Sequence, residues 1–482
     1  MSELLTSILK NWQTDAANES NEKYFLYFDD VKTVLDGSKC FVIGRKGSGK
    51  TAICQYIEKI NEYDAFSAKL DFKNFPFNLL YQYNDNKYSL QHKYITLWIQ
   101  LIYMQVLKLF LRNESIDASF QDMLKKAFPF YMDSKLENQV KRIDSLKVDA
   151  SIKGEFMGAS GTADIGVGGS VSPLQSSWVD NEDTLLQLVK SRCDNSRYYI
   201  VFDALDEDYT NIETDEYQSY YLPLLTSIFK AVQKIRSSLE GYKIYPVVFL
   251  REDIYRQIKD NDKTKWEDTK LQLEWTEEKL KEMLAHRISN EIGSVHLSYD
   301  EAVNRIFTSD ALIKRKRYSH NRIENIPLFK TIMRNSQARP RDLISFIICC
   351  CKTALDNKQS MVRQKDLSGA MSKYSERLAG ELRDEIQNVV PEIETVYSLL
   401  SDIRKQIFTL QEFEKCKKSY TELDKYQTKD LLSALWEYSI IGNQDRVDPS
   451  KHYFKYQNGV RRFSANVSFI IHKGIYNYLQ IT

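Results

Sequence analysis

The residues best suited to chemistry in this chain lie near its N-terminus, at positions 44–51. Their order, Gly-Arg-Lys-Gly-Ser-Gly-Lys-Thr, fits the phosphate-loop pattern G-x-x-x-x-G-K-[ST], called Walker A. Such a backbone curls until several N–H groups point at one spot, which favours a polyphosphate. Lys50 would reach the β- and γ-phosphates of ATP, and the Thr51 hydroxyl would hold Mg²⁺. The predicted nucleotide contacts are Gly44, Arg45, Lys46, Gly47, Ser48, Gly49, Lys50, Thr51 and Ala52.

The segments on either side of this pattern place it where its chemistry needs it. The apolar run Cys40–Ile43 predicts a buried strand. From Thr51 onward, Ile53, Ile57 and Ile60 recur at helical spacing. The alternative is a glycine-rich turn that binds nothing, and the strand before it and helix after it disfavour that alternative.

A second group of polar residues follows another apolar run. Tyr198–Phe202 predicts a buried strand, and the sequence Asp-Ala-Leu-Asp-Glu-Asp follows at 203–208. A buried strand that delivers a carboxylate at its end is a Walker B arrangement, in which Asp203 would hold Mg²⁺. Asp206 or Glu207 would orient and deprotonate the attacking water. The alternative is an acidic turn without a catalytic role.

A third apolar run, Tyr242–Leu250, ends in a basic residue, Arg251. If this strand lies beside the other two, Arg251 would face the γ-phosphate as a sensor or as an arginine finger acting on a neighbouring subunit. An ordinary salt bridge to Glu252, Asp253 or the acidic turn at 203–208 is an equally weighted alternative.

Strands alternate with helices over this part of the chain, which predicts an α/β fold with a parallel sheet covered on both faces. Residues 65–72 and 271–275 supply two further strand candidates. Ligands of such sheets bind at the carboxyl ends of the strands, where Gly44–Thr51, Asp203 and Arg251 would converge.

The composition is that of an ordinary globular protein. The chain has 482 residues, 43% of them hydrophobic, and a net charge of +1, so any nucleic-acid or membrane binding would need a local patch. The cysteines are irregularly spaced, and Cys349, Cys350 and Cys351 are typical of buried hydrophobes in a reducing cytosol. No signal peptide is predicted, and Tyr94–Leu111 is interrupted by polar residues, which favours a core helix over a membrane span. We therefore expect a cytoplasmic protein without membrane contact.

The segments GRKGSGKT, FDALDED, FLREDI and LEW together resemble those of AAA+/STAND-like P-loop ATPases, in particular bacterial predicted ATPases of anti-phage defence islands. The resemblance spans most of residues 36–350. Most AAA+ proteins have adjacent Asp and Glu directly after the strand, whereas the acidic pair here comes three residues later. That spacing resembles the D-x-x-D/E form of STAND proteins and leaves the choice between Asp206 and Glu207 open.

The resemblance also implies a helical lid that supplies another arginine. Ser336–Leu343 resembles the sensor-2 segment of such lids, and a proline suits the first turn of the helix predicted at Arg341–Leu355. Arg339 or Arg341 would then face phosphate from the start of a helix, with two solvated arginines as the alternative. The lid also carries the basic stretch Lys314–Arg317, interpreted as a solvated face or loop, or as a contact for nucleic acid or an acidic partner.

Two other segments differ in character from the core. Residues 148–175 hold six of the 17 glycines and predict a surface insertion, a hairpin or a mobile flap. After 384, helices predicted at Asp384–Ser401, Thr409–Lys417 and Lys429–Tyr438 precede a predicted hairpin across Asn458-Gly459. Three helices and a hairpin resemble a winged helix, which binds DNA or protein. Its presumed wing carries Arg461 and Arg462.

The predicted organisation is a helical lead-in (1–35), a P-loop ATPase core (36–276), a helical lid (277–383) and a winged-helix-like domain (384–482). The resemblance implies an ATP-hydrolysing motor or switch, oligomeric, paired with a separate effector in a defence complex. The alternatives are a DNA-binding initiator-like ATPase and a scaffold that holds ATP with little hydrolysis.

Overall fold

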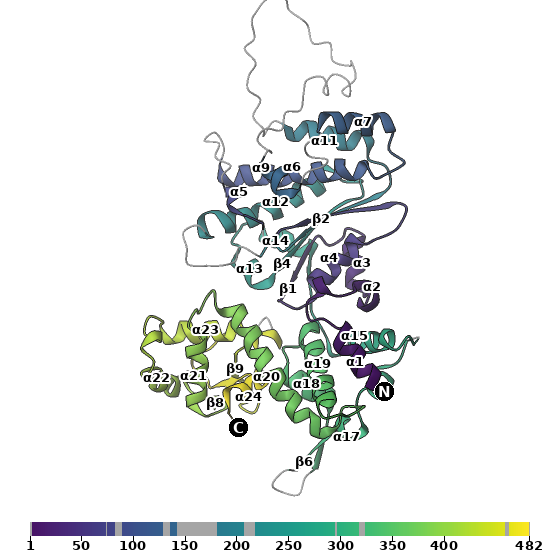
Figure 1. Ribbon diagram of the computed structural model, residues 1–482. Helices are drawn as coiled ribbons and strands as arrows, with labels where there is room; N and C mark the ends of the chain where they lie inside the picture. Colours follow the sequence, from purple (N-terminus) through teal and green to yellow (C-terminus); the bar gives the residue numbers. More distant parts are fainter. Residues whose placement is uncertain are drawn as a thin grey trace, which may run out of the picture. The chain divides into compact units, whose positions relative to one another are not determined.

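The computed structural model describes residues 2–73, 75–81, 89–128, 135–141, 181–206, 217–294, 296–317, 323–457 and 462–481. The chain forms two compact units (Figure 1). The sheet unit comprises Tyr27–Arg45 and Lys50–Leu273, and the helical unit comprises Met1–Leu26, Lys46–Gly49 and Glu274–Thr482.

The sheet unit is built on five parallel strands in the order β2-β3-β4-β1-β5. The strands are β1 (Phe41–Gly44), β2 (Ala65–Asp71), β3 (Arg197–Asp203), β4 (Ile244–Arg251) and β5 (Lys270–Gln272). The predicted strands are therefore present, and the predicted α/β P-loop NTPase fold with a parallel sheet is confirmed.

Helices cover both faces of this sheet. Alternate side chains such as Phe41, Ile200 and Phe202 point into a core shared with α6 (Leu90–Phe110) and α12 (Leu222–Ser238). The intervening side chains face α4 (Lys50–Glu58), which contacts β1, β2, β3 and β4 from the other side (Figure 1). The other helices of this unit are α3 (Asp29–Leu35), α5 (Asn78–Tyr81), α7 (Ala118–Ala127), α9 (Leu136–Lys141), α11 (Asn181–Arg192), α13 (Glu252–Gln257) and α14 (Lys263–Trp266).

The helix predicted over Tyr94–Leu111 is α6, and most of its residues are buried, so its assignment to the core is confirmed. No helix within the described ranges is both long and apolar enough to cross a membrane.

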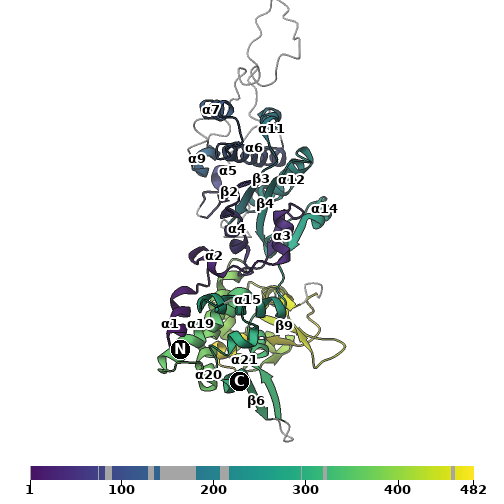
Figure 2. The same cartoon turned by 90° about the vertical axis from the view of Figure 1, so that its right-hand side faces the viewer.

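The helical unit packs a separate core. Its helices before residue 390 are α1 (Ser2–Asn11), α2 (Asn21–Tyr24), α15 (Glu277–Glu291), α16 (Tyr299–Val303), α17 (Ser309–Leu312), α18 (Leu328–Asn335), α19 (Pro340–Asp356) and α20 (Gln364–Ile386). The three adjacent cysteines lie buried on α19, as predicted. A two-stranded antiparallel ribbon, β6 (Ile313–Arg317) with β7 (Ile323–Pro327), projects beyond these helices (Figure 1 and Figure 2).

The N-terminal segment contacts one buried carboxylate of α15, that of Glu291. Glu291 accepts hydrogen bonds from the Ser7 and Tyr24 hydroxyls and from the Asn11 amide, the last at 2.7 Å, and pairs with Lys23 at 3.2 Å. Burial alone would raise the pKa of Glu291, but these donors hold it at about 2.

The last part of the helical unit has the element order of a winged helix. The helices are α21 (Ile393–Ile403), α22 (Leu410–Lys417), α23 (Thr428–Glu437) and α24 (Tyr476–Leu479), and the strands are β8 (Ile407–Phe408), β9 (Ile441–Gln444), β10 (His452–Tyr453) and β11 (Phe469–Ile471). The strands form one sheet in the order β10-β9-β11-β8. This order confirms the predicted winged-helix architecture.

Three local predictions are wrong. No continuous helix spans Asp384–Ser401, because Pro391 cannot continue a helix and separates α20 from α21. Tyr453 was predicted to pair across the Asn458-Gly459 hairpin, but it pairs with β9, where it lies opposite Asn443. Lys314–Arg317, within the segment predicted to be a helical lid, forms a strand. The 148–175 insertion, the Asn458-Gly459 turn, Arg461 and Glu207 lie outside the described residues.

Candidate phosphate-binding site

The 44–51 loop runs from the end of β1 to the first residue of α4, the strand–loop–helix arrangement that was predicted. Gly47 and Gly49 have φ values of +76° and +97°, a region that residues with a Cβ rarely adopt. A Cβ on Gly47 would also lie 2.9 Å from the Cβ of Arg341. Glycine is therefore required at position 47 by both backbone conformation and space.

Lys50 is held at the loop by its own backbone neighbours. Its Nζ donates to the carbonyls of Gly44 at 3.0 Å and Arg45 at 3.1 Å. Burial lowers the pKa of Lys50 to about 8, and the charge of Asp206 opposes that shift. A bound polyanion would favour the charged form of the same amine.

Asp203 ends β3 and is 6% exposed. Its Oδ2 lies 3.3 Å from Nζ of Lys69, which also pairs with Asp71 at 3.1 Å. Burial raises the pKa of the Cys54 thiol, and a hydrogen bond with Asp203 adds to that shift, so Asp203 lies beside α4. Thr51 is three residues before Cys54 and shares its helix face. The hydroxyl and the carboxylate proposed for Mg²⁺ thus belong to facing elements of one unit.

The turn after β3 is sharp and strained. Ala204 has a φ of +57°, and the Tyr221 hydroxyl donates to the carbonyl of Leu205 at 2.7 Å. This turn brings the Oδ2 of Asp206 to 3.7 Å from the Nε of Arg251. Asp206, one of the two acidic candidates for water activation, is close enough to Lys50 for its charge to raise the pKa of that amine.

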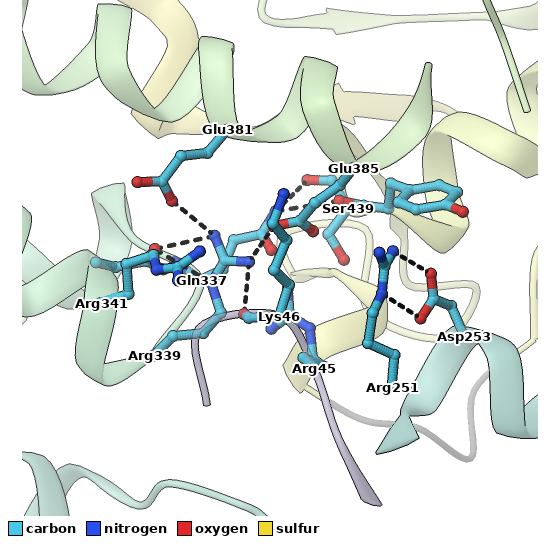
Figure 3. A network of polar contacts seen from close by, with 12 residues as sticks. Arg45, Lys46, Arg251, Asp253, Gln337, Arg339, Arg341, Glu381, Glu385 and Ser439 are labelled. Atoms are coloured by element: carbon cyan, nitrogen blue, oxygen red, sulfur yellow. Dashed lines mark hydrogen bonds and ion pairs between the residues drawn. The ribbon is translucent and has the colours of Figure 1, made fainter. Parts of the chain in front are cut away.

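Arg251 ends β4 directly opposite Gly44 in the parallel register. Its guanidinium donates to both carboxylate oxygens of Asp253, at 3.1 and 2.6 Å (Figure 3). Glu252 pairs instead with Arg256. The salt-bridge alternative thus describes the observed contact, and the strand register places the same arginine beside the start of the 44–51 loop of its own chain.

Arg339 is the N-cap residue of α19 and is only 2% exposed, so the solvated alternative is wrong for this residue. Its guanidinium donates to Asp342 at 2.9 Å. It also donates to Glu385 at 2.7 Å and to the Lys46 carbonyl at 3.1 Å (Figure 3). Burial opposes its charge, yet the carboxylates raise the pKa of Arg339 well above its ordinary value. The Oε2 of Glu381 lies 3.7 Å from the Nη2 of Arg339 and adds a third carboxyl group.

Arg341 lies in the first turn of the same helix but has different surroundings. Its backbone N–H donates to the Gly47 carbonyl at 3.4 Å, and its Nε donates to the Thr14 carbonyl at 3.0 Å. Its side chain packs against Gly47, as the short distance to a Cβ there shows. The two arginines proposed for one role therefore differ, because only Arg339 is buried among carboxylates.

Two contacts at this site were not predicted. The Trp275 indole Nε1 donates to the Ser48 carbonyl at 2.9 Å, and Lys69 pairs with Asp203. The sequence predicts Trp275 only as the end of a strand, whereas β5 stops at Gln272. One feature of the sequence could have indicated the contact of Lys69, namely the alternation of side chains along β2. Lys69 and Asp71 share one face of this strand, and Asp71 lies opposite Asp203.

Comparisons with known protein families and sequences match only part of the chain. A family model described as the FunZ-associated C-terminal helical domain matches residues 278–383, within the helical unit and under a quarter of the chain. A comparison with curated protein sequences found no match.

Solved structures that match this chain include three proteins. Orc1 of Aeropyrum pernix in complex with DNA is 9% identical with a TM-score of 0.38, covering 98% of this chain and 95% of that one. Cdc6p of Pyrobaculum aerophilum is 10% identical with a TM-score of 0.28, covering 93% and 90%. Orc2 of Aeropyrum pernix is 10% identical with a TM-score of 0.29, covering 95% and 92%.

Proposed function

We propose that this protein binds ATP with Mg²⁺ and hydrolyses it. The observation that supports this most is the strand order β3-β4-β1, which brings the ends of three neighbouring parallel strands together. Asp203, Arg251 and Gly44 occupy those ends. Ligands of open α/β sheets bind at this edge.

Each residue has a role that its surroundings support. Lys50 contacts the β- and γ-phosphates, and the loop N–H groups bind the remaining phosphate oxygens. Thr51 and Asp203 would hold Mg²⁺, which supplies charge neutralisation between the phosphates. Asp206 accepts a proton from the attacking water, with Glu207 as the alternative base. Arg251 stabilises the γ-phosphate of its own chain.

Arg341 is the better candidate for a lid arginine that senses phosphate. Arg339 already neutralises Asp342 and Glu385, so it has little charge to offer a nucleotide. Arg341 lies against Gly47 and, unlike Arg339, is partly exposed.

ATP turnover per protomer, measured across protein concentrations, tests the proposal, with Lys50→Ala as the blank and Asp203→Asn as the metal-site variant. We expect turnover well above both variants. Equal turnover and equal nucleotide binding by the wild type and Lys50→Ala would refute the proposal. Bound ATP that stays intact after long incubation would favour the scaffold alternative.

A second candidate function is nucleic-acid binding, favoured by the β6–β7 ribbon. Lys314–Arg317 places four basic residues in succession on β6, whereas β7 carries one charged residue, Glu324. The ribbon pairs with no other strand among those that the structure describes. A two-stranded ribbon fits the DNA major groove. Salt-dependent duplex binding, compared between the wild type, a Lys314→Glu/Lys316→Glu variant and an Arg461→Glu/Arg462→Glu variant, separates the ribbon from the winged helix.

The finer role, a cytoplasmic motor or switch in an oligomeric anti-phage complex with a separate effector, stays a proposal supported by the motif resemblance alone. Light scattering with and without ATP measures the oligomer. Turnover that rises steeply with protein concentration would indicate a site completed by a neighbouring subunit.

A further inference from the structure

Three consecutive backbone carbonyls of the 44–51 loop, those of Lys46, Gly47 and Ser48, each accept a hydrogen bond from another residue of the helical unit. The pairs are Arg339 Nη1 to Lys46 O at 3.1 Å, Arg341 N to Gly47 O at 3.4 Å and Trp275 Nε1 to Ser48 O at 2.9 Å.

A carbonyl held in this way also fixes the direction of the next N–H group. In a trans peptide the C=O and the following N–H lie in one plane and point in opposite directions. A donor on the Ser48 carbonyl therefore turns the Gly49 N–H away from Trp275. These N–H groups are the ones that bind phosphate in a loop of this sequence.

Trp275 is well placed to act as such a donor. The next residue, Thr276, caps α15 by accepting from the Lys279 N–H at 3.2 Å, which fixes the backbone of this segment. The indole also lies along Gly49, since a Cβ on that glycine would be 3.9 Å from the ring. A tryptophan indole donates only, so it suits a carbonyl partner.

We propose that Trp275 is a positioning residue for nucleotide binding, which aims the Gly49 N–H at phosphate by holding the Ser48 carbonyl. This inference rests on the proposed ATP binding. It assigns Trp275 no contact with ATP itself, and so it concerns affinity and not the chemical step.

The test compares Trp275→Phe, which removes the donor and keeps an aromatic ring, with Trp275→Ala, which removes both. For Trp275→Phe we expect the Kd for ADP and the KM for ATP to rise about three- to tenfold, as for loss of one hydrogen bond, with kcat nearly unchanged. Trp436→Phe is the matched control, because that indole is buried in the same unit and its N–H has no partner among the described residues.

The possible outcomes distinguish this inference from the proposed function. An unchanged KM in Trp275→Phe, or an equal rise in Trp436→Phe, would overturn the positioning role while ATP binding stood. A rise in Trp275→Ala alone would assign the effect to ring packing and also overturn it. Wild-type protein that binds no nucleotide would refute both. Denaturant unfolding of each variant shows whether it is folded.

Discussion

Nucleotide binding should be coupled to proton uptake through Lys50. In the nucleotide-free protein, burial lowers the pKa of this amine to about 8. Phosphate oxygens beside the amine would raise its pKa again, because an anion favours the charged form. Binding above pH 8 must therefore add a proton to Lys50, so affinity falls as pH rises through that value. Below pH 7 the amine is already charged, and affinity should not depend on its titration.

The size of the effect follows from the pKa. About half of the free protein carries a neutral Lys50 at pH 8, so each ADP bound should take up about 0.5 proton there, about 0.1 at pH 7 and about 0.9 at pH 9. The Kd for ADP should rise about tenfold between pH 7 and pH 9. Titration calorimetry in two buffers of different ionisation enthalpy measures the uptake directly.

Two variants make this prediction specific. The charge of Asp206 raises the pKa of Lys50. The Asp206→Asn variant lacks this charge, so the pH midpoint of proton uptake should lie below 8. Lys32→Met, at an exposed lysine of the same unit, should leave both midpoint and uptake unchanged. Equal enthalpies in the two buffers at pH 8, together with equal Kd values at pH 7 and pH 9, would refute the reasoning.

Three further predictions test other parts of the site and its support. Arg251→Ala should lower kcat about a hundredfold, and mixing it with Lys50→Ala should restore no turnover, whereas a finger acting between subunits would be rescued. Gly47→Ala should raise the Kd for ADP about tenfold, through backbone strain and a Cβ 2.9 Å from an arginine carbon, while Gly241→Ala, with φ of +86° and open space, should not change it. Glu291→Gln should destabilise the helical unit by about 2–3 kcal/mol at pH 7 in denaturant unfolding. Because the pKa of Glu291 is lowered from 4.5 to about 2, the wild type should lose that advantage as the pH falls between those values, and equal stabilities at pH 7 would contradict the prediction.

The sequence predicted the parts of this site that depend on neighbours in the chain. The 44–51 loop was predictable because its glycines, its lysine and its flanking apolar runs are all local. Asp203 and Arg251 were predictable as strand ends, since parallel strands present their carboxyl ends at one edge. The break at Pro391 also follows from the sequence alone, because a proline cannot continue a helix.

Contacts made by residues distant in sequence could not be predicted in the same way. Trp275 lies 227 positions from Ser48, and nothing in its local pattern indicates a loop contact. The ribbon strand at Lys314–Arg317 lacks the apolar alternation that predicts a strand, because it forms a two-stranded sheet with no further strand beside it among those described.

The two lid arginines show how burial decides between residues that a motif treats alike. Arg339 and Arg341 are two positions apart at the start of one helix. Arg339 is 2% exposed and its guanidinium pairs with Asp342 and Glu385. It stabilises the helical unit, because its removal would leave these buried carboxylates without a partner. Its contact with the Lys46 carbonyl then shapes the loop without bringing free charge to it. Arg341, which is partly exposed and lies against Gly47, is the one whose charge a phosphate could use.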